Sequence, residues 1–216
     1  FYHRKWKVAQ SSADEMKEFR NKLLNVFTKS ETRKWIGREY IEKLFYKHPE
    51  LVGKRCVVAV DLSVTDDFSA VTYLFYMPER YYNKKHCPFH SVTEYFIPEE
   101  TVEKHPNREL YKKWIEQGHL RTIKGMTIDY EFLANDVLKH PHVIQGLGYD
   151  PYKSRDFLKN FIGAGLEEYL YPVKQTYGEF TSYVEAIEIA IYNEQMTFDP
   201  NPITPYCFDN AVIDED

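Results

Sequence analysis

Residues 55–63 read RCVVAVDLS, an apolar run rich in β-branched side chains that stops abruptly at Asp61. Such a run is typical of a strand buried within a sheet. Residues 69–77 form a second strand-like run, and the short polar stretch between the two predicts an antiparallel hairpin. With a third strand expected at residues 91–97, these runs predict that a sheet forms the centre of the fold.

The rest of the chain alternates between helical and strand patterns. Helical spacing, capping residues and apolar runs predict, in order, helices at residues 107–117 and 129–139, a strand at 142–149, a helix at 154–163, a strand at 169–173 and a long helix through Phe180, Val184, Ile187 and Ile191. This order predicts an α/β domain whose mixed β-sheet is flanked by helices, antiparallel on one side and parallel on the other.

The N-terminal part of the chain predicts helices without strands. Apolar residues recur every three or four positions over residues 14–27, and Ser30 is expected to cap a second helix that stops before Pro49. We therefore expect a short helical preface at residues 1–50 and one main domain at residues 51–216. Because the chain does not open with Met, we also expect the true N-terminus to lie upstream.

The composition excludes some classes of protein. No stretch approaches the roughly 20 apolar residues of a membrane span, so no membrane association is expected. Three cysteines without framework spacing suit a reducing cytoplasm. The net charge of −5 counts mildly against nucleic acid, but a nuclease that binds divalent metals needs clustered carboxylates, which lower the net charge.

Several chemistries find no support in the sequence. There is no glycine-rich phosphate loop for ATP and no serine nucleophile in a Gly-x-Ser-x-Gly setting. The stretch HCPFH at residues 86–90 would need a second pair of ligands to bind zinc, and none follows at a similar spacing. We expect a loop that leads into a strand there.

Two acids share one predicted setting, because Asp61 and Asp150 each follow an apolar strand directly. If those strands are parallel neighbours, their ends lie about 5 Å apart and the two carboxylates can share hard cations. Ligands of open α/β sheets bind at this edge. The alternative is that each Asp only forms an Asx-turn or a helix cap. Both acids at like strand ends favour a site.

Other charged residues near these acids have open interpretations. Lys153 and Arg155 begin a helix, where the macrodipole disfavours cations, so they are candidates to contact phosphates, with ordinary solvated charges as the alternative. Asp66 and Asp67 could support Asp61 from behind, although a solvated hairpin turn is the simpler interpretation. Asp129 is expected to cap its helix.

The ordered motifs of the chain resemble the nuclease domain of phage large terminases. The matching residues are VAVDLS at 58–63, DFSA at 67–70, Tyr111, Trp114, Gly118 and Leu120, Thr122, Gly125 and IDY at 128–130, GYDP at 148–151, Val173 with Gln175, NP at 201–202, DNAV at 209–212 and FRNKLLN at 19–25. The resemblance covers nearly the whole chain, and the order and number of the motifs make it fairly specific.

The resemblance implies a ribonuclease H-like fold and a metal-dependent endonuclease that cuts double-stranded DNA during viral genome packaging. It implies two Mg²⁺ or Mn²⁺ ions, with Asp61 and Asp150 as metal ligands. It also implies an N-terminal ATPase domain that is absent here, joined through residues 1–50, with the portal protein and the small terminase subunit as partners in the host cytoplasm.

The third acid expected of such nucleases has no clear place in the chain. Either Asp209 takes this catalytic and metal-binding role, or the ligand lies beyond Asp216, which we favour. Two other functions stay open. One is another ribonuclease H-like nuclease, such as a resolvase, transposase or ribonuclease. The other is a non-catalytic docking module for the portal or the small terminase.

Overall fold

The computed structural model describes residues 33–213, which fall into two compact units. In the smaller unit, strand β1 (Arg33–Lys34) pairs antiparallel with β11 (Val212–Ile213). All other described elements belong to the larger unit, Ile36–Asn210. The helix expected at residues 14–27 lies outside the described residues, and the division into a preface and a main domain stays a prediction.

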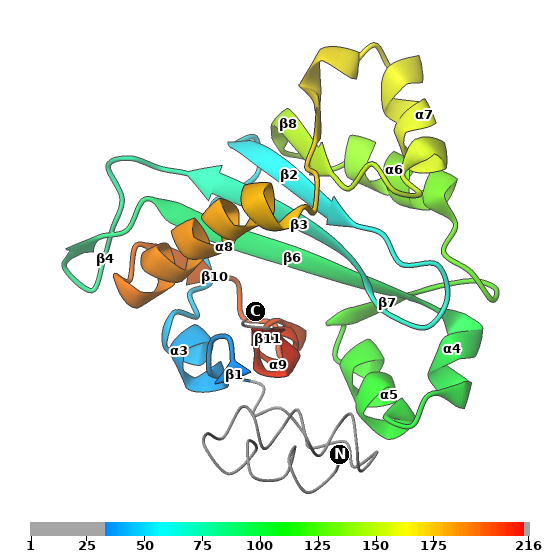
Figure 1. The fold of residues 1–216 in the computed structure, drawn as a ribbon, viewed down its shortest axis with the longest axis horizontal. Helices are drawn as coiled ribbons and strands as arrows, with labels where there is room; N and C mark the ends of the chain where they lie inside the picture. Colours follow the sequence, from blue (N-terminus) through cyan, green and yellow to red (C-terminus); the bar gives the residue numbers. More distant parts are fainter. Residues whose placement is uncertain (1–32, 214–216) are drawn as a thin grey trace, which may run out of the picture. The chain divides into compact units, whose positions relative to one another are not determined.

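A mixed sheet forms the centre of the larger unit, with the strand order β10-β6-β3-β2-β8-β9 and β7 beside β6 (Figure 1). Its strands are β2 (Arg55–Asp61), β3 (Ser69–Tyr76), β6 (Phe89–Pro98), β7 (Leu120–Ile123), β8 (Val143–Tyr149), β9 (Leu170–Pro172) and β10 (Met196–Phe198). β3 pairs antiparallel with β2 and β6, whereas β8 runs parallel to β2 and β9 parallel to β8. The predicted mixed α/β sheet is therefore confirmed.

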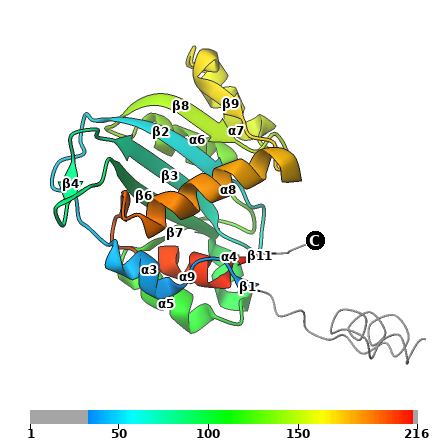
Figure 2. The same cartoon turned by 60° about the vertical axis from the view of Figure 1, so that its left-hand side comes forward.

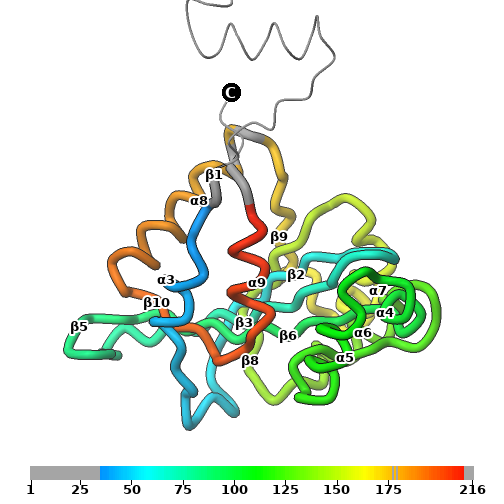
Figure 3. Tube along the Cα trace, turned by 90° about the horizontal axis from the view of Figure 1, so that it is seen from below, coloured from blue at the N-terminus to red at the C-terminus, as the bar shows by residue number. Residues whose placement is uncertain are grey.

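Helices lie on both faces of this sheet (Figure 2). They are α3 (Arg38–Lys43), α4 (Glu99–Lys104), α5 (Arg108–Glu116), α6 (Tyr130–Leu138), α7 (Arg155–Gly163), α8 (Tyr177–Tyr192) and α9 (Ile203–Asn210), with a 3₁₀ turn at Glu167–Tyr169. α6 and α7 pack together over one face, and α5 and α9 cover part of the other. Figure 3 shows α3 and α9 side by side.

The alternation of β2 determines which of its residues can reach a site. Cys56, Val58 and Val60 are buried and join the core under α6 and α7. Val57 and Asp61 are exposed, because successive side chains of a strand point to opposite faces. Asp61 therefore belongs to the face that α8 crosses in Figure 2.

Helix α8 is only partly packed. Of its side chains that the structure describes, Ile191 alone is buried. Phe180, Tyr183 and Ile187 share the apolar side of the helix with Ile191, but 41%, 54% and 41% of their surfaces are exposed. The predicted stripe is thus covered at the C-terminal end of α8, where the helix meets β10 and α3.

Some local features differ from the expectations. The second N-terminal helix begins at Arg38 rather than directly after Ser30. His86, which was expected in a loop, belongs to β5 (Lys85–His86), and β5 forms a small hairpin with β4 (Tyr81–Tyr82). Arg80 holds this hairpin, since its guanidinium donates to the carbonyls of Cys87 and Phe89. No helix within residues 33–213 is long and apolar enough to cross a membrane.

Candidate active site

The parallel pairing of β2 with β8 brings Asp61 and Asp150 to the same edge of the sheet. Val60 is the register partner of Tyr149, and each acid is the next residue along its strand. Because neighbouring strands lie about 4.8 Å apart, the two acids leave the sheet side by side. The predicted neighbourhood of these strands is confirmed, although the role of the acids is not tested by it.

Both acids line one cavity of about 270 Å³ between the sheet and the beginning of α8. Its lining residues are Ala59, Val60, Asp61, Ala70, Thr72, Gly148, Tyr149, Asp150, Val173, Gln175 and Phe180. Small residues form the floor: a Cβ at Gly148 would already be 3.5 Å from the Val173 side chain. A methyl group at this position would therefore occupy part of the cavity at ordinary contact distance.

The electrostatics of Asp61 mark it as an unusual carboxyl. Although the residue keeps an exposed side, partial burial of the carboxyl raises the pKa of Asp61, and the like charges of Asp67 and Asp150 raise it further. Asp67 acts more strongly than Asp150. The carboxylate is thus held where its negative charge is disfavoured, which a cation would reverse.

The sequence predicts at most a supporting role for Asp67, because this residue lies in a polar hairpin turn. In the structure its carboxyl accepts a hydrogen bond from the Phe68 amide at 2.8 Å, as turn residues do. Its charge nevertheless influences Asp61 and also the Cys207 thiol on α9. The signal in the sequence was the short hairpin, which returns Asp67 towards the end of β2.

Asp150 combines the two interpretations given to it. Its Oδ1 accepts a hydrogen bond from the Tyr152 amide at 2.9 Å, so it does form the local turn. An ionised carboxylate has about four acceptor sites, so this single bond leaves capacity for a ligand. The turn thus fixes the position of the Asp150 carboxyl and leaves most of its acceptor sites open.

Lys153 and Arg155 follow Asp150 closely. Lys153 has a left-handed backbone (φ 62°), and its Nζ lies 5.0 Å from the centroid of the Tyr152 ring. Arg155 is the first residue of α7 and is exposed. Ser154 occupies the N-cap position without a capping hydrogen bond from its side chain. Both cations therefore lie close in sequence to one acid of the cavity, on its exposed side.

Asp209, the candidate third acid, belongs to α9, and its role stays a prediction. It lies two residues after Cys207. Burial raises the pKa of Cys207 to about 12, and the charges of Asp67 and Asp61 contribute. Within residues 33–213 there is no group of three or more His, Cys, Asp or Glu placed to hold a metal ion.

The other polar candidates have separate partners. His86 Nε2 is 2.6 Å from the Pro78 carbonyl, Cys87 accepts from Arg80, and His90 Nδ1 is 2.9 Å from Thr197 Oγ1. The three side chains of the HCPFH stretch therefore bond to different groups. Asp129 accepts a hydrogen bond from the Phe132 amide at 3.0 Å, which confirms its predicted role as a helix cap.

A divalent cation suits the donor set at the sheet edge. Asp61 and Asp150 supply carboxylate oxygens, which are the ligands that Mg²⁺ and Mn²⁺ prefer. Their mutual repulsion, visible in the raised pKa of Asp61, is the condition that a bound cation relieves. The pair of carboxylates therefore suits a divalent cation in its chemistry, although residues 33–213 supply no third ligand of this kind beside it.

The fold and this edge define a class: an α/β domain with acids at the carboxyl ends of two neighbouring parallel strands of a mixed sheet. Within that class, the family described as terminase large subunit, endonuclease domain matches residues 2–216. The chain belongs to this family.

Individual relatives are more distant. The chain is 25% identical over 219 residues to protein YmfN of Escherichia coli K12, a match that covers 94% of the chain and 46% of YmfN. It is also 25% identical over 126 residues to the large terminase subunit of Enterobacteria phage HK97, covering 56% of the chain and 25% of that protein. The crystal structure of the HK97 bacteriophage large terminase shares the fold, with a TM-score of 0.71 at 22% identity over 97% of the chain and 43% of the terminase. The chain thus spans less than half the length of these relatives.

Proposed function

We propose that this domain is a metal-dependent endonuclease with a ribonuclease H-like fold, which cuts double-stranded DNA during viral genome packaging. The observation that carries the proposal is the register of β2 and β8, which places Asp61 and Asp150 in one cavity at the sheet edge. Family membership supports the same reaction class.

The proposed roles follow from the positions of the side chains. Asp61 and Asp150 would hold two Mg²⁺ or Mn²⁺ ions, and Asp67 adds negative charge beside them. When bound, such ions activate water and stabilise the leaving oxygen in phosphodiester hydrolysis. Lys153 and Arg155 would hold backbone phosphates, and contacts of that kind do not read the base sequence. Asp209 on α9 is the candidate within this chain for a third ligand.

The partners of the whole protein are also part of the proposal. The family works in genome packaging, so we propose that this domain acts with an N-terminal ATPase domain, a portal protein and a small terminase subunit in the host cytoplasm. The exposed cations beside Asp150 support contact with the DNA backbone.

Plasmid nicking by the purified chain tests the proposal, with Mg²⁺, Mn²⁺ or EDTA, beside Asp61→Asn and Asp150→Asn. We expect metal-dependent nicking that both variants lose. Asp199→Asn is the matched control, since Asp199 pairs with the exposed Lys47 away from the cavity. Equal cutting by Asp61→Asn would refute the site, and cutting restricted to RNA–DNA hybrids would make the domain a ribonuclease. Complete inactivity together with binding to a portal protein would favour the docking role.

A further inference from the structure

The turn at residues 62–68 determines where Asp67 lies relative to Asp61. The turn begins directly after Asp61 and leads into β3, whose Ala70 is the register partner of Asp61. Because the turn joins Asp61 to the paired strand β3, the conformation of these few residues decides how the Asp61 and Asp67 carboxyls are arranged. The turn is therefore a structural part of the proposed site.

Serines close the turn from inside. The Ser63 hydroxyl donates to the Asp67 carbonyl at 2.6 Å, and the Ser63 amide donates to the hydroxyl of the fully buried Ser69 at 3.0 Å. The second bond attaches the start of the turn to β3, and neither bond reaches beyond the hairpin.

Three consecutive carbonyls of the turn are held from outside. The Ser63 carbonyl accepts from the Tyr130 hydroxyl at 2.8 Å, and the Val64 carbonyl accepts from the Ile128 amide at 3.0 Å. The Thr65 carbonyl accepts from the Thr101 hydroxyl at 2.6 Å. The donors come from α6, from the segment before it and from α4. Three separate parts of the chain therefore hold residues 63–65 by hydrogen bonds.

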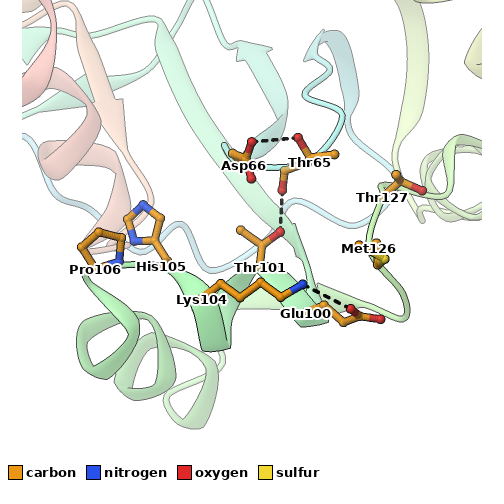
Figure 4. A pocket seen from close by; sticks show the side chains of 9 residues that line it. All are labelled: Thr65, Asp66, Glu100, Thr101, Lys104, His105, Pro106, Met126 and Thr127. Carbon is orange, nitrogen blue, oxygen red and sulfur yellow. Dashed lines mark hydrogen bonds and ion pairs between the residues drawn. The ribbon is translucent and has the colours of Figure 1, made fainter.

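The bond from Thr101 matters because packing does not support this side of the turn. A cavity of about 590 Å³ lies here, lined by Thr65 and Asp66 of the turn, by residues of α4 and by Met126 and Thr127 (Figure 4). Figure 4 shows the Thr101 hydroxyl reaching the Thr65 carbonyl at the edge of this cavity. Because side chains do not fill this space, the hydrogen bond from Thr101 holds the Thr65 carbonyl in position.

We propose that Thr101 and Tyr130 are positioning residues, which hold the turn at residues 62–68 and thereby keep the Asp61 carboxyl, at the end of β2, in place in the acidic cavity. This inference rests on the proposed nuclease function. Neither residue needs to contact DNA or a metal ion. Their effect passes through the carbonyls of Ser63 and Thr65.

Substitutions that remove only the hydroxyls test the proposal. Thr101→Val and Tyr130→Phe keep the side-chain shape, Thr101→Ser restores the donor, and Thr197→Val removes a similarly buried threonine hydroxyl that bonds to Arg80 and His90 elsewhere. The readouts are amide hydrogen exchange of residues 62–68, the Kd for Mn²⁺ by calorimetry, and nicking, all on the full chain.

We expect faster exchange in the turn and a Kd for Mn²⁺ raised about fivefold in Thr101→Val and Tyr130→Phe, the loss typical of one hydrogen bond. Thr101→Ser should match the parent, and Thr197→Val should change neither readout. Unchanged exchange in the turn, or faster exchange with unchanged Mn²⁺ affinity, would overturn the inference while leaving the nuclease proposal intact. A parent that neither binds Mn²⁺ nor nicks DNA would overturn both.

Discussion

Asp61 and Asp150 stand side by side because each lies one residue beyond the registered pair Val60–Tyr149 of two parallel strands. Their arrangement costs stability as well as creating a site, since burial and the like charges of Asp67 and Asp150 raise the pKa of Asp61. An acid with a raised pKa binds its proton more tightly when folded than when unfolded. The ionised form of Asp61 therefore opposes folding until a cation neutralises it.

Asp61→Asn should therefore raise the Tm at pH 7–8 in the absence of metal. The penalty on the parent is present above the raised pKa and disappears as the pH falls below the usual value for Asp, so the gain in Tm should shrink towards pH 3. Added Mn²⁺ should stabilise the parent much more than the variant. Differential scanning fluorimetry across pH, with and without metal, measures both effects. A lower Tm for the variant at every pH would contradict this account.

Gly148→Ala should separate activity from stability. The new Cβ would lie 3.5 Å from the Val173 side chain and 3.9 Å from the Val58 carbonyl, which are ordinary contacts. Alanine is also better than glycine within a strand by roughly 0.5–1 kcal/mol, so the Tm should be unchanged or higher. Because the methyl group adds to the floor of the acidic cavity, metal-dependent nicking should fall severalfold.

The control for this prediction is Gly163→Ala at the end of α7, where a Cβ meets nothing within 4 Å. Both its stability and its nicking should match or exceed those of the parent. Equal nicking by Gly148→Ala and Gly163→Ala would show that the cavity floor does not limit access to the acids.

The sequence predicts the long elements of this fold because their periodicity is strong. β2, β3, β8 and α6 each carry a complete apolar pattern with clear ends, and the structure places them within a residue or two of the expected positions. The hairpin between β2 and β3 also follows from local composition. These features depend on neighbouring residues in the chain, which a single sequence displays.

The short elements depend on distant partners and escape such reasoning. β10 has three residues and is defined by pairing with β6, whose Phe89 lies more than a hundred positions earlier. α9 contains Pro205, which reads locally as a break. The pair of acids followed from strand ends, and the short hairpin brought Asp67 back towards them, but the conformation of its turn depends on donors such as Thr101 that are remote in sequence.

Helix α8 should depend on its C-terminal end for attachment. Ile191 is 2% exposed, whereas Ile189 is 57% exposed on the same helix. Ile191→Ala should therefore lower the free energy of unfolding by about 2–5 kcal/mol, and Ile189→Ala by less than about 0.5 kcal/mol. Urea denaturation of both variants measures the difference. Similar losses would mean that the first turns of α8 are covered in solution.

His90 should make the domain sensitive to mild acid. It is fully buried, its Nδ1 is 2.9 Å from Thr197 Oγ1, and its Nε2 is buried without a hydrogen-bond partner among the described residues. Burial lowers the pKa of His90 to about 3, with contributions from Arg80 and His48. Charging this ring would place a second cation beside the Arg80 guanidinium in a dry environment.

The sign of the effect follows from proton binding. Between pH 6.5, the usual pKa, and about pH 3, the unfolded chain protonates His90 but the folded domain does not. The free energy of unfolding therefore decreases as the pH is lowered through this range. One such group contributes up to about 1.4 kcal/mol per pH unit. His90→Asn, which keeps a polar atom near Thr197, should reduce the loss of unfolding free energy between pH 7 and pH 5, and His86→Asn, at an exposed histidine, should not. Urea denaturation at the two pH values decides, and an equal loss in the parent and in His90→Asn would show that His90 is accessible to protons in the folded state.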